Sequence, residues 1–252
     1  MQAEWIVGIN PVEAVLGEGA MRVREVWVER DARNPRLAAL TALARRQGIA
    51  VELRPRSALD RVASGARHQG IAAQCVAAAM HTEQTLPELL DAAGREALFL
   101  VLDGVTDPHN LGACVRSAAA AAATAVIVPR DRAVGLTPVA RRAAAGGAER
   151  VPLLQVTNLS RTLATLKDAG VWLVALDSAI DGARALEQID LTVPSALVLG
   201  AEGEGMRRLT REACDYRACI PMAGTMESLN VSVAAGIALF EALRQRRSGR
   251  PA

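Results

Sequence analysis

The sequence predicts an α/β protein with a mostly parallel sheet in its C-terminal part and a smaller α/β unit before it. Strand-like segments after residue 97 are continuously apolar, which indicates strands that are covered on both faces. Helical segments separate these strands, as parallel strands require. The more polar stretch 81–96 is predicted to be a linker with a short helix, which gives domains at 1–80 and 97–252.

Residues 1–80 are predicted to form a compact unit with its own small core. Segments rich in β-branched residues and flanked by charge or glycine are typical of strands. Those segments are Val23–Glu29, Ile49–Leu53 and Ile71–Ala78. An amphipathic helix is expected over Pro35–Gln47, because its leucines and Ala44 fall on one face.

The C-terminal part is predicted to alternate strands and helices. The expected strands are Leu98–Asp103, Thr124–Val128, Val151–Leu154, Val171–Leu176, Ala196–Gly200 and Arg217–Pro221. The expected helices lie near 111–122, 137–145, 158–169 and 229–246.

Composition narrows the function classes only slightly. The net charge of +2 says little about partners, since clustering of basic residues matters more than their total. Solvated helix faces and a frayed tail explain the observed clusters as well as RNA binding does. The clusters are Arg45, Arg46, Arg54, Arg56, Arg61 and Arg67, and then Arg244, Arg246, Arg247 and Arg250.

The cysteines and the apolar segments indicate neither a metal site nor a membrane protein. Cys75, Cys114, Cys214 and Cys219 form no Cys-x-x-Cys pair and have no nearby histidines, so we expect no metal. We find neither a secretory signal nor an apolar run of about 18 residues, so a cytoplasmic protein without a membrane partner is expected.

Three polar, glycine-containing stretches follow predicted strands. They are Asp103–Ser117, Val198–Met206 and Ile220–Ala235. Each by itself is explained by turn structure, and Ser228 and Asn230 are typical caps for the following helix. Because ligands gather at the carboxyl ends of strands in open α/β sheets, three such turns together predict a binding site.

The usual nucleotide fingerprints are absent from the sequence. No Gly-x-Gly-x-x-Gly follows the first strand of the large domain, and there is no Gly-Lys-[Ser/Thr] phosphate loop. An ordinary dinucleotide enzyme, an NTPase and the common open-sheet methyltransferase are therefore disfavoured.

In order, the three stretches resemble the three motifs of the SpoU (TrmH-type) branch of the SPOUT RNA methyltransferases. The first is Asp107-Pro-His-Asn-Leu-Gly with Arg116, and the second is Leu199-Gly-Ala-Glu-Gly-Glu-Gly. The third runs from Ile220-Pro-Met to Glu-Ser-Leu-Asn-Val-Ser232. The resemblance covers roughly residues 97–246. The segment Gly8–Val15 resembles the family's substrate-binding extension, whose fold is similar to a ribosomal-protein RNA-binding domain.

Over its whole length the chain is most similar to bacterial enzymes that 2′-O-methylate a guanosine in 23S rRNA. The resemblance implies a deep trefoil knot in the C-terminal part, S-adenosyl-L-methionine bound in that knot, and a homodimer with the pocket near its interface. The implied cofactor positions are Leu199, Gly200, Glu202, Gly203, Ile220, Met222, Ser228 and Leu229. Two departures from the family pattern are the alanine run after Ser117 and the segment Ala143–Glu149.

The resemblance assigns catalysis to Arg116, with Asn110, Glu202, Ser228 and Asn230 as a hydrogen-bonding frame. A guanidinium does not normally lose its proton in a protein. We therefore expect Arg116 to hold an RNA phosphate and to stabilise the developing 2′-alkoxide. His109 is an alternative base by its chemistry, but its place in a tight turn favours a structural role.

Two other functions remain open from the sequence. One is the same chemistry on tRNA, with the N-terminal domain used differently. The other is a non-catalytic RNA-binding or ribosome-assembly protein on the same fold, against which the intact set of motif residues argues.

Overall fold

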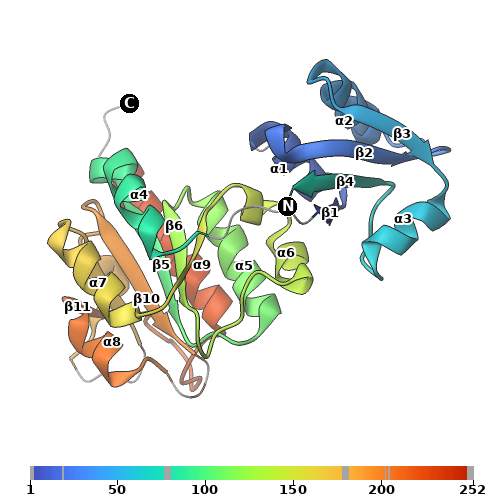
Figure 1. Cartoon of the computed structure of the whole chain (residues 1–252). Coiled ribbons are helices and arrows are strands. Elements are labelled where there is room, and N and C mark those ends of the chain that lie inside the picture. Colours follow the sequence, from blue (N-terminus) through green and yellow to red (C-terminus); the bar gives the residue numbers. More distant parts are fainter. Residues whose placement is uncertain are drawn as a thin grey trace. The chain divides into compact units, whose positions relative to one another are not determined.

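The computed structural model describes residues 3–18, 20–76, 81–177, 182–201, 203 and 205–248, which form two units (Figure 1). The first unit contains the described residues up to 76 together with Ala145–Arg150, and the second contains the remainder. The stretch 81–96, expected as a linker, folds within the second unit. Leu86 in this stretch is 1% exposed and belongs to the core of that unit, so its apolar residues hold it there.

The first unit is built on a four-stranded sheet with the order β1-β4-β2-β3. Strands β2 and β3 are parallel, and the other neighbouring pairs are antiparallel. Its elements are β1 (Ala3–Val7), α1 (Ile9–Glu18), η1 (Ala20–Arg22), β2 (Val23–Glu29), α2 (Pro35–Arg46), β3 (Ala50–Arg54), α3 (Arg56–Ala63) and β4 (Ile71–Val76), with η4 (Gly147–Glu149) grouped here.

The predicted strands and helix of this unit are confirmed to within one residue, except at the end of β4. That strand ends at Val76, and residues 77–78 of the prediction lie outside the described residues. Elements β1, α1 and α3 were not predicted from the sequence. Strand β1 has five residues and α3 has eight, and such short segments give weak periodicity.

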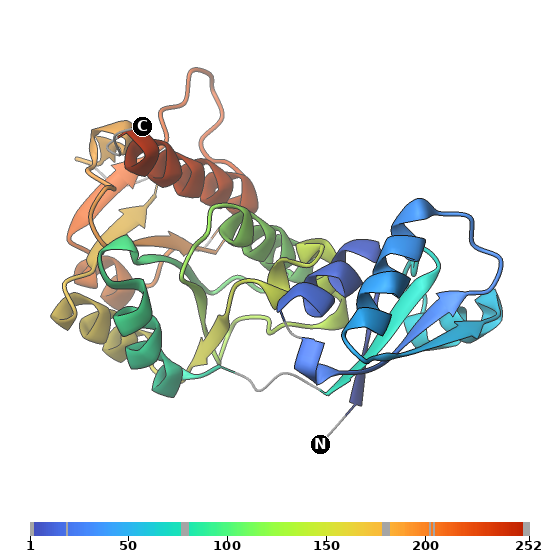
Figure 2. The ribbon, with the colours of Figure 1, turned by 90° about the horizontal axis from the view of Figure 1, so that it is seen from above.

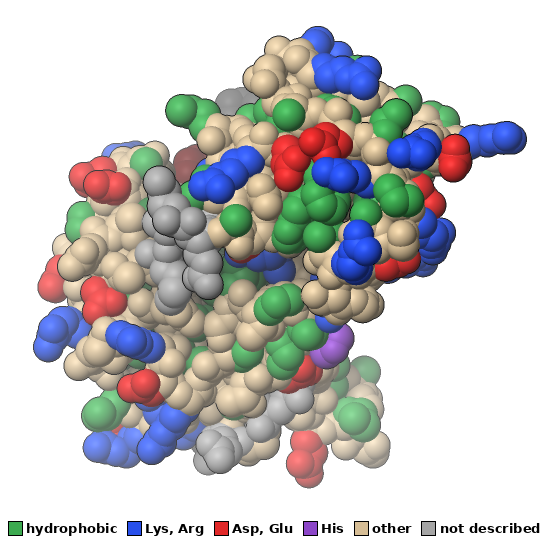
Figure 3. All heavy atoms as spheres, turned by 45° about the vertical axis from the view of Figure 1, so that its right-hand side comes forward, with side chains coloured by type: hydrophobic (Ala, Val, Ile, Leu, Met, Phe, Trp, Pro, Cys, Tyr) green, Lys and Arg blue, Asp and Glu red, His purple; other side chains and the backbone are tan. Residues whose placement is uncertain are grey.

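Aromatic and basic side chains share the surface of the first unit. The ring centroids of Trp5 and Trp27 lie 4.4 Å apart, and the Arg54 guanidinium lies 4.7 Å from the Trp27 centroid. Figure 3 shows arginine side chains spread over this unit among hydrophobic ones. The exposed members of the predicted basic cluster are Arg45, Arg46, Arg56, Arg61 and Arg67.

The second unit contains a seven-stranded sheet of order β7-β6-β5-β10-β8-β11-β9, in which all neighbouring strands are parallel. Its strands are β5 (Leu98–Asp103), β6 (Ala125–Pro129), β7 (Leu153–Val156), β8 (Trp172–Leu176), β9 (Arg184–Ala185), β10 (Ser195–Gly200) and β11 (Tyr216–Cys219). Every residue of β5 and β6 is buried, which confirms that these strands are covered on both faces.

Helices cover both faces of this sheet (Figure 1). The α-helices are α4 (Leu86–Ala93), α5 (Pro108–Ala120), α6 (Pro138–Ala144), α7 (Leu159–Asp168), α8 (Arg208–Ala213) and α9 (Val231–Ser248), and the short η elements are η2 (Glu83–Thr85), η3 (Gly94–Glu96) and η5 (Leu186–Gln188). Helices α5, α6 and α9 lie on one face, and α4, α7 and α8 lie on the other. Figure 2 shows α5 and α9 side by side, in agreement with their close packing.

Boundaries differ from the predictions at a few elements. Helix α5 begins at Pro108, three residues earlier than expected, because proline suits the first helical position and Asp107 accepts a hydrogen bond from the His109 amide at 2.9 Å. Strand β7 begins two residues later than predicted. Elements α8 and β9 were missed. No helix in the described residues is long and apolar enough to cross a membrane.

Candidate functional site

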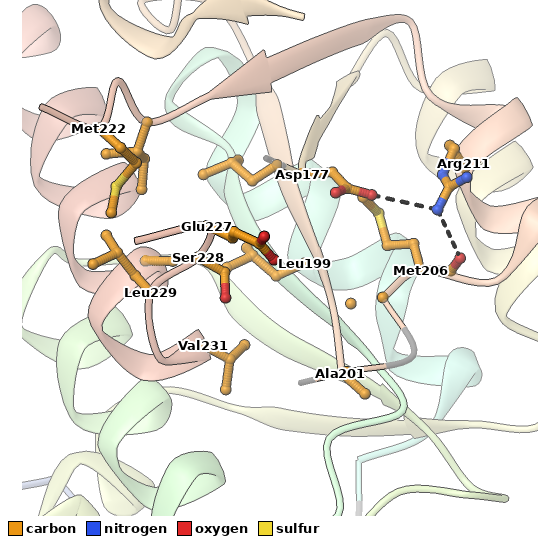
Figure 4. Close-up of a pocket in the computed structure, with 16 residues that line it drawn as sticks. Asp177, Leu199, Ala201, Met206, Arg211, Met222, Glu227, Ser228, Leu229 and Val231 are labelled. Atoms are coloured by element: carbon orange, nitrogen blue, oxygen red, sulfur yellow. Dashed lines mark hydrogen bonds and ion pairs between the residues drawn. The ribbon is translucent and has the colours of Figure 1, made fainter. Parts of the chain in front are cut away.

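The segments that follow β8, β10 and β11 surround one cavity at the carboxyl end of the sheet (Figure 4). The cavity has a volume of about 690 Å³. Its walls combine apolar side chains with glycine backbone and a few polar groups, as is typical of sites for small organic ligands. The lining residues are Leu176, Asp177, Leu199, Gly200, Ala201, Gly203, Gly205, Met206, Arg211, Ile220, Met222, Glu227, Ser228, Leu229, Val231 and Ala234.

The structure brings together most of the cofactor residues expected from the sequence. Those that line the cavity are Leu199, Gly200, Gly203, Ile220, Met222, Ser228 and Leu229. Glu202, expected in both the cofactor and catalytic sets, lies outside the described residues. Asn110, Arg116 and Asn230 are not among the lining residues.

Gly200 ends β10 at a point where two backbone segments meet. A Cβ at this position would lie 2.2 Å from the Gly205 carbonyl carbon and 2.2 Å from the Met206 nitrogen. Ala201 and Gly205 form a backbone bridge that closes the loop, and Gly203 and Gly205 have positive φ values of 83° and 66°. The wall of the cavity is therefore a tight turn of backbone, which only glycine at position 200 permits.

Three charged residues in the cavity wall were not predicted as site residues. Arg211 of α8 donates to Asp177 Oδ2 and to the Met206 carbonyl oxygen, both at 3.4 Å (Figure 4). Asp177 comes directly after β8. A polar residue at the carboxyl end of a predicted strand indicates a ligand site, so the sequence contained a signal for Asp177. Arg211 has no comparable signal, because α8 itself was not recognised. Glu227 also lines the cavity, next to the expected Ser228.

An ion pair between a buried carboxylate and a half-exposed arginine attaches the loop after β10 to the end of β5. The side chain of Asp103 is fully buried, and its carboxylate accepts hydrogen bonds from the Arg207 backbone nitrogen at 3.1 Å and from Arg207 Nε at 2.7 Å. Gly104, the next residue, has φ +91°, and a Cβ there would lie 3.5 Å from the Cβ of Ala201. The first and second motifs are therefore in contact.

The first and third motifs meet through two asparagines. Asn230 Nδ2 donates to Asn110 Oδ1 at 3.0 Å, and Asn230 Oδ1 accepts from the Ser232 amide at 2.9 Å. Asn230 therefore caps α9, as expected, whereas Ser228 lies two residues earlier and is exposed in the cavity wall. The motif glycine Gly112 sets the contact of α5 with α6, because a Cβ there would lie 2.3 Å from the Ala140 carbonyl oxygen.

Arg116 is exposed on α5, and its guanidinium forms no hydrogen bond or ion pair with the described part of the chain. His109 is also exposed, in the first turn of α5. The structure leaves the guanidinium accessible to a ligand that is not part of this chain.

This sheet and this cavity define an α/β protein with a site suited to a small organic ligand at the carboxyl edge of its strands. Residues 97–240 match the SpoU rRNA Methylase family, and residues 5–80 match the family described as RNA 2'-O ribose methyltransferase substrate binding. The chain therefore belongs to the SpoU rRNA methylase family, and its fold is of the SPOUT type.

Individual relatives match nearly the whole chain. The 23S rRNA (guanosine-2'-O-)-methyltransferase RlmB of Xylella fastidiosa is 52% identical over 96% of this chain and 97% of its own length. RlmB of Pseudomonas syringae pv. tomato is 49% identical over 99% of this chain and 98% of its own length. Among solved structures, the SpoU methyltransferase AviRb of Streptomyces viridochromogenes, in complex with the cofactor AdoMet, has a TM-score of 0.77 at 25% identity and covers 98% of this chain and 92% of its own.

Proposed function

We propose that the protein is an S-adenosylmethionine-dependent methyltransferase that modifies the ribose 2′-oxygen of a guanosine in 23S rRNA. The observation that carries this proposal is that the family's three motifs converge at one end of the sheet, two of them around a single cavity. Relatives named for this 23S rRNA activity match both domains of the chain, which favours rRNA over tRNA. A ribosomal substrate implies a cytoplasmic enzyme.

The residues present fit the cofactor. The glycine turn at Gly200 brings backbone against the cavity, where a side chain would occupy the space, and Leu199, Ile220 and Leu229 supply apolar walls. Glu227 supplies negative charge suited to a ligand with a sulfonium and an ammonium group, whereas Asp177 is paired with Arg211 in the same wall. When bound, S-adenosylmethionine supplies the methyl group. Gly203, Met222 and Ser228 complete the proposed cofactor set, together with Glu202.

Arg116 is proposed to act on the RNA rather than on the cofactor. Its guanidinium stays protonated, holds an RNA phosphate through its planar fork, and stabilises the negative charge that develops on the 2′-oxygen. The proton leaves through phosphate or water. Asn110 and Asn230, held by their mutual hydrogen bond, form the frame with Ser228 and Glu202 that orients the ribose.

The two domains divide the work in this proposal. Residues 1–80 bind RNA through their exposed arginines. Residues 81–96 pack into the core of the second unit, and residues 97–252 carry out the reaction. Within the latter part, we infer that the chain threads through its own loop as a trefoil knot. Family membership supports this, as does the way the segment before α9 and the loop after β10 wall the same cavity.

A homodimer is part of the same proposal. Helix α9 begins in the cavity wall with Val231 and Ala234, and it then carries an exposed apolar stripe of Val233, Ile237 and Phe240. These residues are spaced four and three apart, so they lie on one helix face. A second copy that covers this stripe would lie next to the cavity.

Two measurements and one variant test the proposed function. Calorimetry with S-adenosylmethionine should show binding, and its absence with and without RNA would remove the enzyme proposal. Mapping 2′-O-methylated positions with and without the gene should show one guanosine lost from the 23S rRNA map, and an unchanged 23S map with a changed tRNA map would move the substrate to tRNA. Arg116→Lys keeps the positive charge but loses the planar, bidentate guanidinium. It should therefore lower the methyl-transfer rate at least tenfold.

A further inference from the structure

The loop after β6, residues 130–137, displays two arginines that no motif includes. Arg130 and Arg132 are both exposed, and neither guanidinium has a hydrogen-bond or ion-pair partner among the residues that the structure describes. Many other arginines of the second unit are engaged, for example Arg207 with Asp103 and Arg211 with Asp177. The two guanidiniums flank the exposed Asp131, so these three residues carry a net positive charge with two guanidinium groups available for hydrogen bonding.

This loop is fixed to both of its neighbours. The Arg130 amide donates to the Val156 carbonyl at the end of β7 at 2.8 Å, and the Val134 amide donates to the Val105 carbonyl after β5 at 2.9 Å. Arg132 itself has φ +58°, a left-handed conformation that costs a non-glycine residue energy. The backbone is thus held in a defined shape that directs both side chains outward.

The loop also lies close to the cavity wall. Gly104 lies near both the loop and the cavity wall. A Cβ at Gly104 would be 4.0 Å from the Arg132 carbonyl oxygen and 3.5 Å from the Ala201 Cβ. Ala201 lines the cavity. Arg132 is therefore separated from the cavity wall by a single residue, at the carboxyl edge of the sheet.

We propose that Arg130 and Arg132 form a phosphate-binding rim that holds the RNA backbone beside the reacting nucleotide. This proposal rests on the proposed function, and it assigns the loop after β6 to substrate positioning. RNA phosphates suit the site because arginine binds them with charge-assisted hydrogen bonds, and because such contacts need no base-specific partner. The two residues touch RNA only, so they affect RNA binding and leave cofactor binding unchanged.

The test compares two double variants that remove equal charge. Arg130→Gln/Arg132→Gln removes the proposed rim. Arg95→Gln/Arg247→Gln removes two exposed arginines at the opposite edge, where Arg246 next to Arg247 donates to the Glu96 and Ala97 carbonyls at 2.6 and 3.1 Å. The substrate is protein-free 23S rRNA from cells that lack the gene, with saturating S-adenosylmethionine.

The rim variant should raise KM for RNA at least tenfold, keep kcat within about threefold at saturating RNA, and bind the cofactor as the wild type does. In this variant, the slope of log K for RNA binding against log salt concentration should be less steep by about 1.4. Each single-strand phosphate contact contributes about 0.7 to that slope, and the variant removes two such contacts. Arg130→Lys/Arg132→Lys should recover most of the salt slope. The edge control should match the wild type in all these measurements.

The proposed phosphate-binding rim would be overturned if the rim variant kept the wild-type KM for RNA and the wild-type salt slope. It would also be overturned if the edge control showed the same rise in KM as the rim variant. If wild-type protein transfers no methyl group to RNA, the proposed function fails instead. The salt slope of RNA binding alone then decides whether the rim binds phosphate.

Discussion

Asn230 Nδ2 donates a hydrogen bond to Asn110 Oδ1 at 3.0 Å across 120 residues of sequence. The same Asn230 side chain accepts hydrogen bonds from the backbone nitrogen of Ser232 at 2.9 Å and from its hydroxyl at 2.6 Å. One amide therefore starts α9 and joins it to the first turn of α5. Asn230 is therefore both the cap of α9 and a member of the proposed catalytic frame.

Replacing Asn230 separates these two roles. Asn230→Ser keeps a capping oxygen but is too short to reach Asn110, whereas Asn230→Ala loses both contacts. We expect Asn230→Ala to lower the free energy of unfolding by about 1 kcal/mol and Asn230→Ser to lower it by much less. Both should lower kcat at least tenfold. Urea unfolding and methyl-transfer assays measure the two effects, and full activity in Asn230→Ser would leave Asn230 as a cap only.

Gly200→Ala should destroy the cofactor pocket. The added methyl carbon would lie 2.2 Å from backbone atoms of Gly205 and Met206, so the loop must move out of its wall position. We expect affinity for S-adenosylmethionine to fall at least a hundredfold in calorimetry. Gly224→Ala is the matched control, because a Cβ at Gly224 meets nothing within 4 Å. Cofactor affinity within twofold of the wild type in Gly200→Ala would contradict the proposed wall.

Arg207→Ala should destabilise the second unit. The Asp103 side chain is fully buried, and without the Arg207 side chain its carboxylate keeps, among the described residues, the backbone nitrogen of residue 207 as its donor. Leaving this buried carboxylate without its charged partner should cost about 2 kcal/mol in the free energy of unfolding, which is less than for a fully buried pair because the Arg207 side chain is 47% exposed. Asp103→Asn added to Arg207→Ala should recover part of this loss, because it removes the unpaired charge. Urea unfolding of the wild type and of the single and double variants measures both effects. A single variant as stable as the wild type would argue against a stabilising role of the ion pair.

Phe240→Glu should weaken the proposed homodimer. Phe240 is 49% exposed in the single chain and lies on the stripe with Val233 and Ile237, so a charge there opposes burial by a second copy. We expect the dimer dissociation constant to rise at least a hundredfold in sedimentation equilibrium. Leu209→Glu on α8 is the control, since Leu209 is 56% exposed and lies outside the stripe. A monomeric wild-type protein would remove the dimer from the proposal.

Cys214 should contribute to loss of stability at alkaline pH. Burial, with a smaller effect of Asp215, raises the pKa of the Cys214 thiol from 9.0 to about 12. Between these values the unfolded chain releases a proton that the folded chain retains, so the free energy of unfolding falls as pH rises from 9 toward 12. Cys214→Ala should show a shallower decline over this range in urea unfolding. Parallel curves for the two proteins would show that Cys214 titrates normally.

Much of the second unit follows from local patterns. Continuous apolar runs such as Leu98–Asp103 predicted buried parallel strands, because a strand covered on both faces has no polar side to display. The average polarity of the stretch 81–96 indicates a linker, but Leu86 is buried in the core of the second unit, and this burial depends on a partner surface that local polarity does not reveal. The six-residue helix α8 carries Arg211 into the cavity, and no periodic signal reveals so short an element.

The sequence by itself determined the order of the longer elements, the three motif stretches and most of the residues around the cavity, because glycines and polar groups at strand ends are local features. Tertiary structure alone decided which of these meet. The contact of Asn110 with Asn230 depends on the packing of α5 against α9. The contacts of Asp103 with Arg207 and of Val134 with Val105 depend on strands β5, β6 and β10 lying side by side in the sheet. That order comes from long-range packing, and spacing along the chain does not encode it.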